Sequence, residues 1–181
     1  MTTRLTLVIA GIAGLAAIGT ALAATDTIYR YKNPRTGYFS ISPLHMSPST
    51  TNAADNYTIL PGTSEIVSGN MNSCFGSGIN LPQGSTITKL TVWFTSNMAS
   101  DGRIQFWRFD NISGESDTAV NAVMPNNTAT RKMITYDISS TFAEVNNNRY
   151  SYGLLWCNLD GNGGETFGGA RVTYTYDTAG D

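Results

Sequence analysis

A short glycine-rich segment, Asp160-Gly-Asn-Gly-Gly-Glu165, carries the residue types in this chain that best suit ion chemistry. Calcium takes about six to eight oxygen ligands, several of them carboxylates, and Asp160, Asn162 and Glu165 could supply side-chain oxygens. The segment has only two carboxylates, however, and its spacing departs from that of an EF-hand loop. Asp-Gly and Asn-Gly are also the dipeptides most typical of tight hairpin turns. We therefore expect a turn between two strands, with a metal site as the weaker alternative.

Cys74 and Cys157 are the only cysteines, and each falls in or beside a predicted strand. An even number in an exported chain favours a disulfide bond, with two buried free thiols as the alternative. The only histidine, His45, lies among apolar residues and prolines, without the motif of a zinc site or of a serine nucleophile. No spacing singles out a glycosidase-like pair of carboxylates. We expect no cofactor, and an enzyme is the least favoured function.

Two tryptophans are the feature that most suggests a ligand. The runs 86–96 and 102–109 alternate apolar and polar residues, which predicts a hairpin with its turn near Ala99. In that register Trp93 would lie beside Trp107 on the more polar face. The polar neighbours there would be Lys89, Arg103 and Gln105. Exposed rings among hydrogen-bond donors would suit a sugar ring or a partner's loop, whereas the alternative is a purely structural aromatic pair.

β-Strands must position all of these residues. Charged residues make up only 13% of the chain, tyrosine is plentiful, and helical patterns are poor after residue 24, the best being a short run at 141–147. Alternating runs separated by turn clusters predict about nine or ten short strands, drawn from 27–31, 37–42, 44–46, 57–60, 72–75, 86–96, 102–109, 119–124, 132–137, 149–157 and 166–176. The last two runs are predicted to form a second hairpin. The fold class is therefore all-β: a single antiparallel β-sandwich, jelly-roll-like, with little helix and a long loop over 47–69.

The beginning of the chain predicts export. Arg4 precedes an apolar run that closes on Ala21-Leu22-Ala23, which is typical of a secretory signal peptide over residues 1–23. An uncleaved membrane anchor is the alternative. Residues 24–181 would then form a single β-sandwich domain without a further membrane span, secreted or associated with the cell envelope. The chain has a net charge of −2 and lacks long basic runs, so nucleic acid is not an expected partner.

Three motifs together resemble exported bacterial β-sandwich proteins of uncharacterised function. The first is an N-L-P-x-G-x-x-x-T-x-L run, matched here at Asn80, Leu81, Pro82, Gly84, Thr88 and Leu90. The others are the runs "FAEVNNNRYSYGLLW" and "GGARVTYTY". Gln83 replaces the usual histidine and Asn146 the usual aspartate, so the side chains most suited to chemistry are missing. The resemblance implies a compact β-sandwich without an established activity.

Three functions follow from these observations, in decreasing order of support. The first is a secreted, non-catalytic binding or surface module whose ligand is a glycan or an envelope component. The second is a structural protein of the cell envelope that oligomerises through a sandwich face. The third is an enzyme. The sequence leaves the ligand, the partner and the oligomeric state open.

Overall fold

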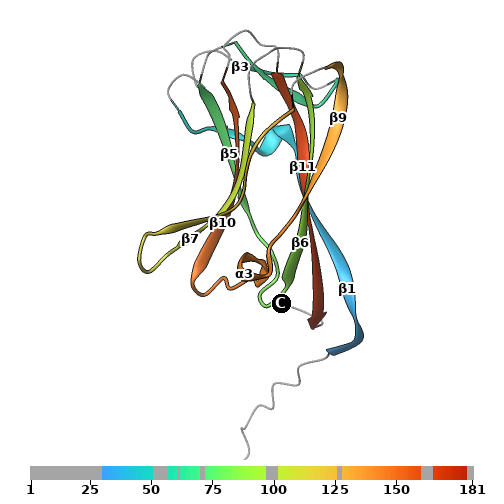
Figure 1. Ribbon diagram of the computed structural model, residues 1–181, viewed down its shortest axis with the longest axis vertical. Coiled ribbons are helices and arrows are strands. Elements are labelled where there is room, and N and C mark those ends of the chain that lie inside the picture. The colour runs from blue at the N-terminus through green and yellow to red at the C-terminus, as the bar shows by residue number, and fades with distance from the viewer. Residues whose placement is uncertain are drawn as a thin grey trace, which may run out of the picture.

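The computed structural model describes residues 30–50, 57–60, 62–69, 72–96, 102–125, 128–159 and 165–178. In this part of the chain eleven strands form two packed antiparallel sheets (Figure 1). The six-stranded sheet contains β1 (Arg30–Ile41), β3 (Tyr57–Leu60), β4 (Glu65–Ser68), β6 (Thr86–Ser96), β9 (Thr128–Asp137) and β11 (Glu165–Thr178). The five-stranded sheet contains β2 (Ser47–Pro48), β5 (Ser73–Ile79), β7 (Arg103–Asp110), β8 (Ser116–Val123) and β10 (Tyr150–Asn158). The predicted all-β sandwich is confirmed.

Side chains from both sheets meet in one apolar core. Strand alternation buries Leu90, Val92 and Phe94 of β6, as their spacing predicts. The ring of Trp156 on β10 lies between two others, 5.6 Å from Phe75 and 5.9 Å from Phe167, measured between ring centroids. Fully burying a large apolar side chain stabilises the fold by roughly 1.5–3 kcal/mol. Because Phe75 and Trp156 belong to the five-stranded sheet and Phe167 to the other, this stack stabilises the packing of the two sheets.

Both predicted hairpins are wrong, although the predicted faces are right. β6 pairs with β9 and β11, whereas β7 pairs with β8 and β10 in the other sheet. Likewise β10 and β11 belong to different sheets. In each case the chain crosses from one layer to the other, so strands consecutive in sequence pack across the core. The alternation of apolar and polar residues along a strand identifies its buried face, but it does not identify the strand with which it pairs.

Three local features also differ from expectation. The 47–69 stretch contains two unexpected strands, β2 and β4, beside β3, which matches the predicted run 57–60. Residues 44–46 do not form a strand, because Pro43 begins the 3-10 turn η1 (Pro43–His45), whose first turn is capped by the Ser42 hydroxyl. The predicted helical run is a single turn, α3 (Ser140–Ala143), which buries Phe142. Residues 1–23 lie outside the described residues.

The predicted disulfide bond between Cys74 and Cys157 is confirmed. The two cysteines face each other directly in the register of β5 and β10, with their Cα atoms 4.0 Å apart. The two bonded cysteines are separated by 83 positions in the sequence. No helix in the described part of the chain is long and apolar enough to cross a membrane.

Candidate ligand-binding cleft

Two loops meet at one end of the sandwich, and they carry two of the sequence motifs quoted above. The first loop, residues 80–85, connects β5 to β6, and the second, residues 144–149, connects α3 to β10. The backbone N–H of Gly84 donates to the carbonyl of Val145 at 2.9 Å, and the N–H of Val145 donates to the carbonyl of Ser85 at 2.8 Å. These reciprocal bonds hold the loops edge to edge.

The first loop is a tight turn for local reasons. Pro82 fixes its own φ, and the Ser85 hydroxyl and backbone N–H both donate to the Pro82 carbonyl, at 2.7 and 3.1 Å. Gly84 has a φ of +73°, a left-handed conformation that glycine adopts without steric cost. The N-L-P-x-G motif thus forms a structural turn that leads into β6.

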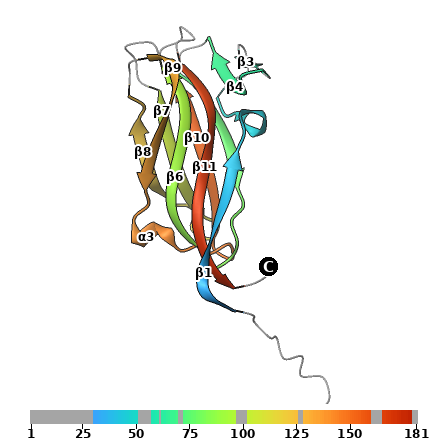
Figure 2. The same ribbon diagram turned by 90° about the vertical axis from the view of Figure 1, so that its right-hand side faces the viewer.

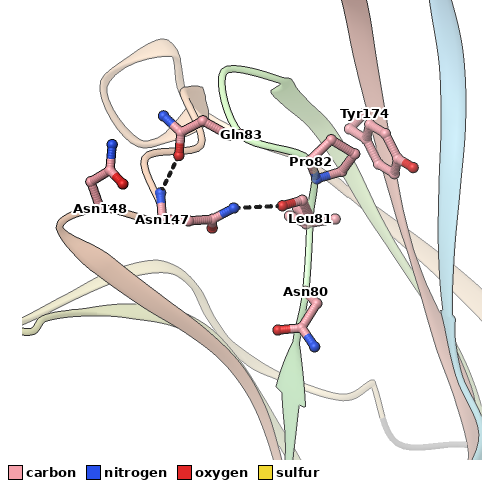
Figure 3. Close-up of a pocket in the computed structure, with 7 residues that line it drawn as sticks. All are labelled: Asn80, Leu81, Pro82, Gln83, Asn147, Asn148 and Tyr174. Atoms are coloured by element: carbon pink, nitrogen blue, oxygen red, sulfur yellow. Dashed lines mark hydrogen bonds between the residues drawn. The ribbon is translucent and has the colours of Figure 1, made fainter. Parts of the chain in front are cut away.

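Asn147 fastens the second loop to the first. Its side-chain Nδ2 donates to the carbonyl of Leu81 at 2.8 Å, and its backbone N–H donates to Oε1 of Gln83 at 2.7 Å (Figure 3). Gln83, which departs from the pattern of the resembling proteins, therefore has a structural partner. Both amide groups are oriented by these bonds, which limits their freedom to rotate.

Tyr152 anchors the second loop from below. Its phenolic oxygen accepts a hydrogen bond from the Asn146 backbone N–H at 2.9 Å and donates to the Glu144 carbonyl at 3.4 Å. Burial raises the pKa of the Tyr152 phenol above its ordinary value of 10.0. The hydroxyl therefore remains a neutral donor and acceptor at physiological pH.

A shallow cleft of about 570 Å³ opens beside these loops. Its described lining consists of Asn80, Leu81, Pro82, Gln83, Asn147, Asn148 and Tyr174. Four of these seven residues carry a side-chain amide, and Tyr174 of β11 adds an aromatic ring that lies next to Pro82 (Figure 3). None of the seven is charged at neutral pH. The cleft thus offers many neutral donors and acceptors beside one ring.

The four amides divide into two kinds. Gln83 and Asn147 are engaged in the bonds between the loops. Within the described part of the chain, the side chains of Asn80 and Asn148 make no hydrogen bond, and both residues are exposed. A rigid pair therefore frames the cleft, and a second pair can bond to a ligand. The quoted motifs include these loops and, in the run "GGARVTYTY" on β11, Tyr174, but the sequence patterns predict no ligand-binding residue in any of them.

The five residues predicted to bind ligand do not form one site. Trp93 and Lys89 lie on the outer face of the six-stranded sheet, where Trp93 has Met133 and Gly169 as register neighbours. Trp107 lies on the other sheet, and its ring centroid is 3.8 Å from that of Phe109. The remaining two, Arg103 and Gln105, precede Trp107 on β7. The cross-strand tryptophan pair is wrong, because β6 and β7 are not neighbours; binding by either face alone stays a prediction.

The alternative metal site falls largely outside the described residues, which omit 160–164. Glu165 is described and buried, and its carboxylate accepts hydrogen bonds from the Gly102 backbone N–H and, at 3.5 Å, from the Ser96 hydroxyl. Among the described residues no cluster of three or more His, Cys, Asp or Glu side chains could hold an ion. His45 is exposed on η1.

Neither a protein-family model nor a curated protein matches the chain. Solved structures do match, and carbohydrate-binding modules are among them. A xylan-binding module, CBM15, has a TM-score of 0.50 at 9% identity, covering 77% of this chain and 97% of that chain. The C-terminal CBM6 of a laminarinase from Zobellia galactanivorans has a TM-score of 0.47 at 20% identity, covering 76% and 99%.

The third module, from Cellvibrio mixtus lichenase 5A and solved with cellotriose, has a TM-score of 0.47 at 12% identity and covers 74% of this chain and 95% of its own. At these identities the likeness is one of fold. The chain shares the jelly-roll β-sandwich fold of the xylan-binding module.

Proposed function

We propose that this chain is a non-catalytic glycan-binding module and that its ligand binds in the cleft formed by the 80–85 and 144–149 loops. The observation that carries the proposal is the composition of the cleft: four amides, one tyrosine ring and no charged side chain among the described lining. Each amide has a carbonyl acceptor and an NH₂ donor. Sugar hydroxyls also donate and accept, so the two sets of groups are complementary.

The ring of Tyr174 offers an apolar surface for the C–H face of a sugar. Ligand sites combine apolar or aromatic area with a few oriented polar groups. The C–H face of a pyranose ring can pack on the partly exposed ring of Tyr174, while its hydroxyls reach Asn80 and Asn148. Because the loops are already bonded to each other, little ordering is needed on binding.

Binding fits this lining better than catalysis does. Glycoside hydrolysis normally uses two carboxylic acids on either side of the scissile bond. The described lining of the cleft supplies neither a carboxylate nor an imidazole. A xylan-binding module with the same fold shows only that such a sandwich can carry a glycan site. We further propose that residues 1–23 direct export and that residues 24–181 form the exported domain, which agrees with the Cys74–Cys157 bond.

Affinity electrophoresis in gels containing xylan, mixed-linkage β-glucan or glucomannan tests the proposal. Wild-type residues 24–181 should be retarded by at least one polymer, and Asn148→Ala and Tyr174→Ala should each weaken binding by about tenfold, the loss expected for one good hydrogen bond or stacking contact. The matched controls are Asn121→Ala on β8 and Tyr38→Ala on β1, which lie outside the cleft lining. Retardation by none of the polymers, or equal loss in cleft and control variants, would overturn the proposal.

A further inference from the structure

We propose that the ligand is an extended chain of sugars, which leaves the cleft along three tyrosine rings, Tyr174, Tyr176 and Tyr31. This inference rests on the proposed function, since Tyr174 lines the cleft itself. It adds the ligand's form: a polysaccharide bound along its length, as opposed to a single sugar or a chain end.

The three rings form a continuous path. Tyr174 and Tyr176 are two residues apart on β11 and therefore point to the same face of the strand. Their ring centroids are 5.9 Å apart, and the ring of Tyr31 on β1 follows at 5.8 Å from Tyr176. All three are partly exposed, and Tyr31 and Tyr176 lie beyond the apolar core. The exposed faces of these rings are therefore free of core contacts and can pack against a ligand.

Hollows accompany the rings. A depression of about 250 Å³ beside Tyr176 is lined by Pro34, Gly84, Thr86, Thr175, Tyr176 and Asp177. Gly84 directly follows Gln83 of the cleft, so the two hollows share the 80–85 loop. A further hollow of about 160 Å³ lies over residues 31–35, next to Tyr31. A chain leaving the cleft thus meets a hollow at each successive ring.

The strand ends that carry the path are tied together. β1 and the end of β11 run side by side to the lower end of the molecule (Figures 1 and 2). The Arg30 guanidinium donates to the Asp177 carboxylate at 2.8 Å, and the Arg35 guanidinium lies 5.2 Å from the centroid of the Tyr31 ring. Tyr31 and Tyr176 consequently have fixed neighbours before any ligand arrives.

Isothermal titration of residues 24–181 with β-1,4-linked xylo- and cello-oligosaccharides, from the monosaccharide to the hexasaccharide, tests the path. We expect affinity to rise with length in at least one series, and Tyr176→Leu and Tyr31→Leu to lower hexasaccharide affinity about three- to tenfold while leaving disaccharide affinity unchanged. Leucine keeps apolar volume on the strand but removes the ring. Tyr174→Leu should weaken both lengths.

The outcomes separate this inference from the proposed function. Binding that is equally strong for disaccharide and hexasaccharide, or Tyr176→Leu and Tyr31→Leu variants that bind the hexasaccharide like wild type, would overturn the path and leave the cleft intact. No binding at any length would reject the cleft, and the path with it. Near-ultraviolet circular dichroism establishes that each variant keeps its tertiary structure.

Discussion

The ring of Tyr174 lies over the backbone of Gly37, its register partner across β1 and β11. A Cβ atom at position 37 would collide with that ring, so glycine is the residue that lets it lie against β1. The aromatic wall of the cleft is thus placed by a residue that does not line the cleft.

Gly37→Ala should therefore displace the Tyr174 ring and weaken glycan binding by about three- to tenfold, the loss of one aromatic contact. The stability cost should be small, because the ring is the movable end of a partly exposed side chain. Titration calorimetry and thermal unfolding measure the two effects. Gly78→Ala, where a Cβ would meet nothing within 4 Å, is the matched control. Unchanged binding by Gly37→Ala would contradict the role given to this contact.

Asn147 and Asn148 are adjacent but should respond differently to alanine. Asn147→Ala removes the bond to the Leu81 carbonyl, so we expect a loss of about 1 kcal/mol in the free energy of unfolding as well as weaker binding. Asn148→Ala should leave stability within about 0.5 kcal/mol of wild type and weaken binding alone. Urea unfolding together with affinity electrophoresis distinguishes the two. Equal stability losses would mean that Asn148 also holds the loop.

The disulfide bond should be a major source of stability. In the chain-entropy model a bond closing a loop of this size lowers the entropy of the unfolded chain, which gives a stabilisation of about 4 kcal/mol. A Cys74→Ser/Cys157→Ser double variant should lose up to that amount in urea unfolding. Thiol titration of the denatured, unreduced wild-type protein should find no free thiol, and the appearance of two would contradict the bond.

The ionised carboxylate of Asp110, which lies outside the cleft lining, should make the folding stability sensitive to acid. Its carboxylate accepts hydrogen bonds from the Ile112 backbone N–H and from Arg149, and these lower its pKa below the ordinary value of 3.8. Because the folded-state pKa is the lower one, the stabilisation is present above pH 3.8 and is lost as pH falls through the folded-state value. The melting temperatures of wild type and Asp110→Asn should therefore differ at neutral pH and converge below pH 3.8. A difference in melting temperature that stays constant with pH would contradict a stabilising role for the Asp110 charge.

The tryptophans provide a test of where ligand binds. Trp93 and Trp107 lie on different sheets, and neither is in the cleft lining. We expect Trp93→Ala and Trp107→Ala to retain oligosaccharide affinity within about twofold, as substitutions remote from a site normally do. Titration calorimetry with the oligosaccharide bound best by wild type measures this. If only one of the two variants loses binding, the ligand site is on the sheet that carries that tryptophan, which would contradict the cleft.

Sequence patterns predicted the faces of the strands but not their partners. Ile104 and Phe106 are buried as their alternation predicts, because a strand that is half-buried must alternate. Pairing, however, depends on strands distant in sequence. β6 pairs with β11, and nothing in the period of either strand specifies that partner. The error in the tryptophan pair follows directly, since it assumed that neighbours in sequence are neighbours in a sheet.

The quoted sequence motifs form the cleft loops, but they do not predict a binding site there. The N-L-P-x-G run and the Asn146–Asn148 run were both singled out, and both contribute to the cleft. What could not be predicted is that they meet, because the Asn147–Leu81 bond spans 66 residues. Tyr174 also lies in a quoted run, "GGARVTYTY", but its place beside Pro82 depends on the same long-range packing. Short runs of sequence thus supply the side chains of the cleft, whereas contacts between distant residues bring those runs together.

The position of β11 has a consequence for the order of events in biosynthesis. β11 pairs with β1, β4 and β6, and is thus the strand to which most of the six-stranded sheet is joined, yet it follows every other described strand in the sequence. A ribosome releases the chain from its N-terminus, so β1, β4 and β6 emerge before the strand that unites them. Until the residues of β11 have emerged, β1, β4 and β6 each keep an unpaired edge, so the six-stranded sheet cannot be completed before them.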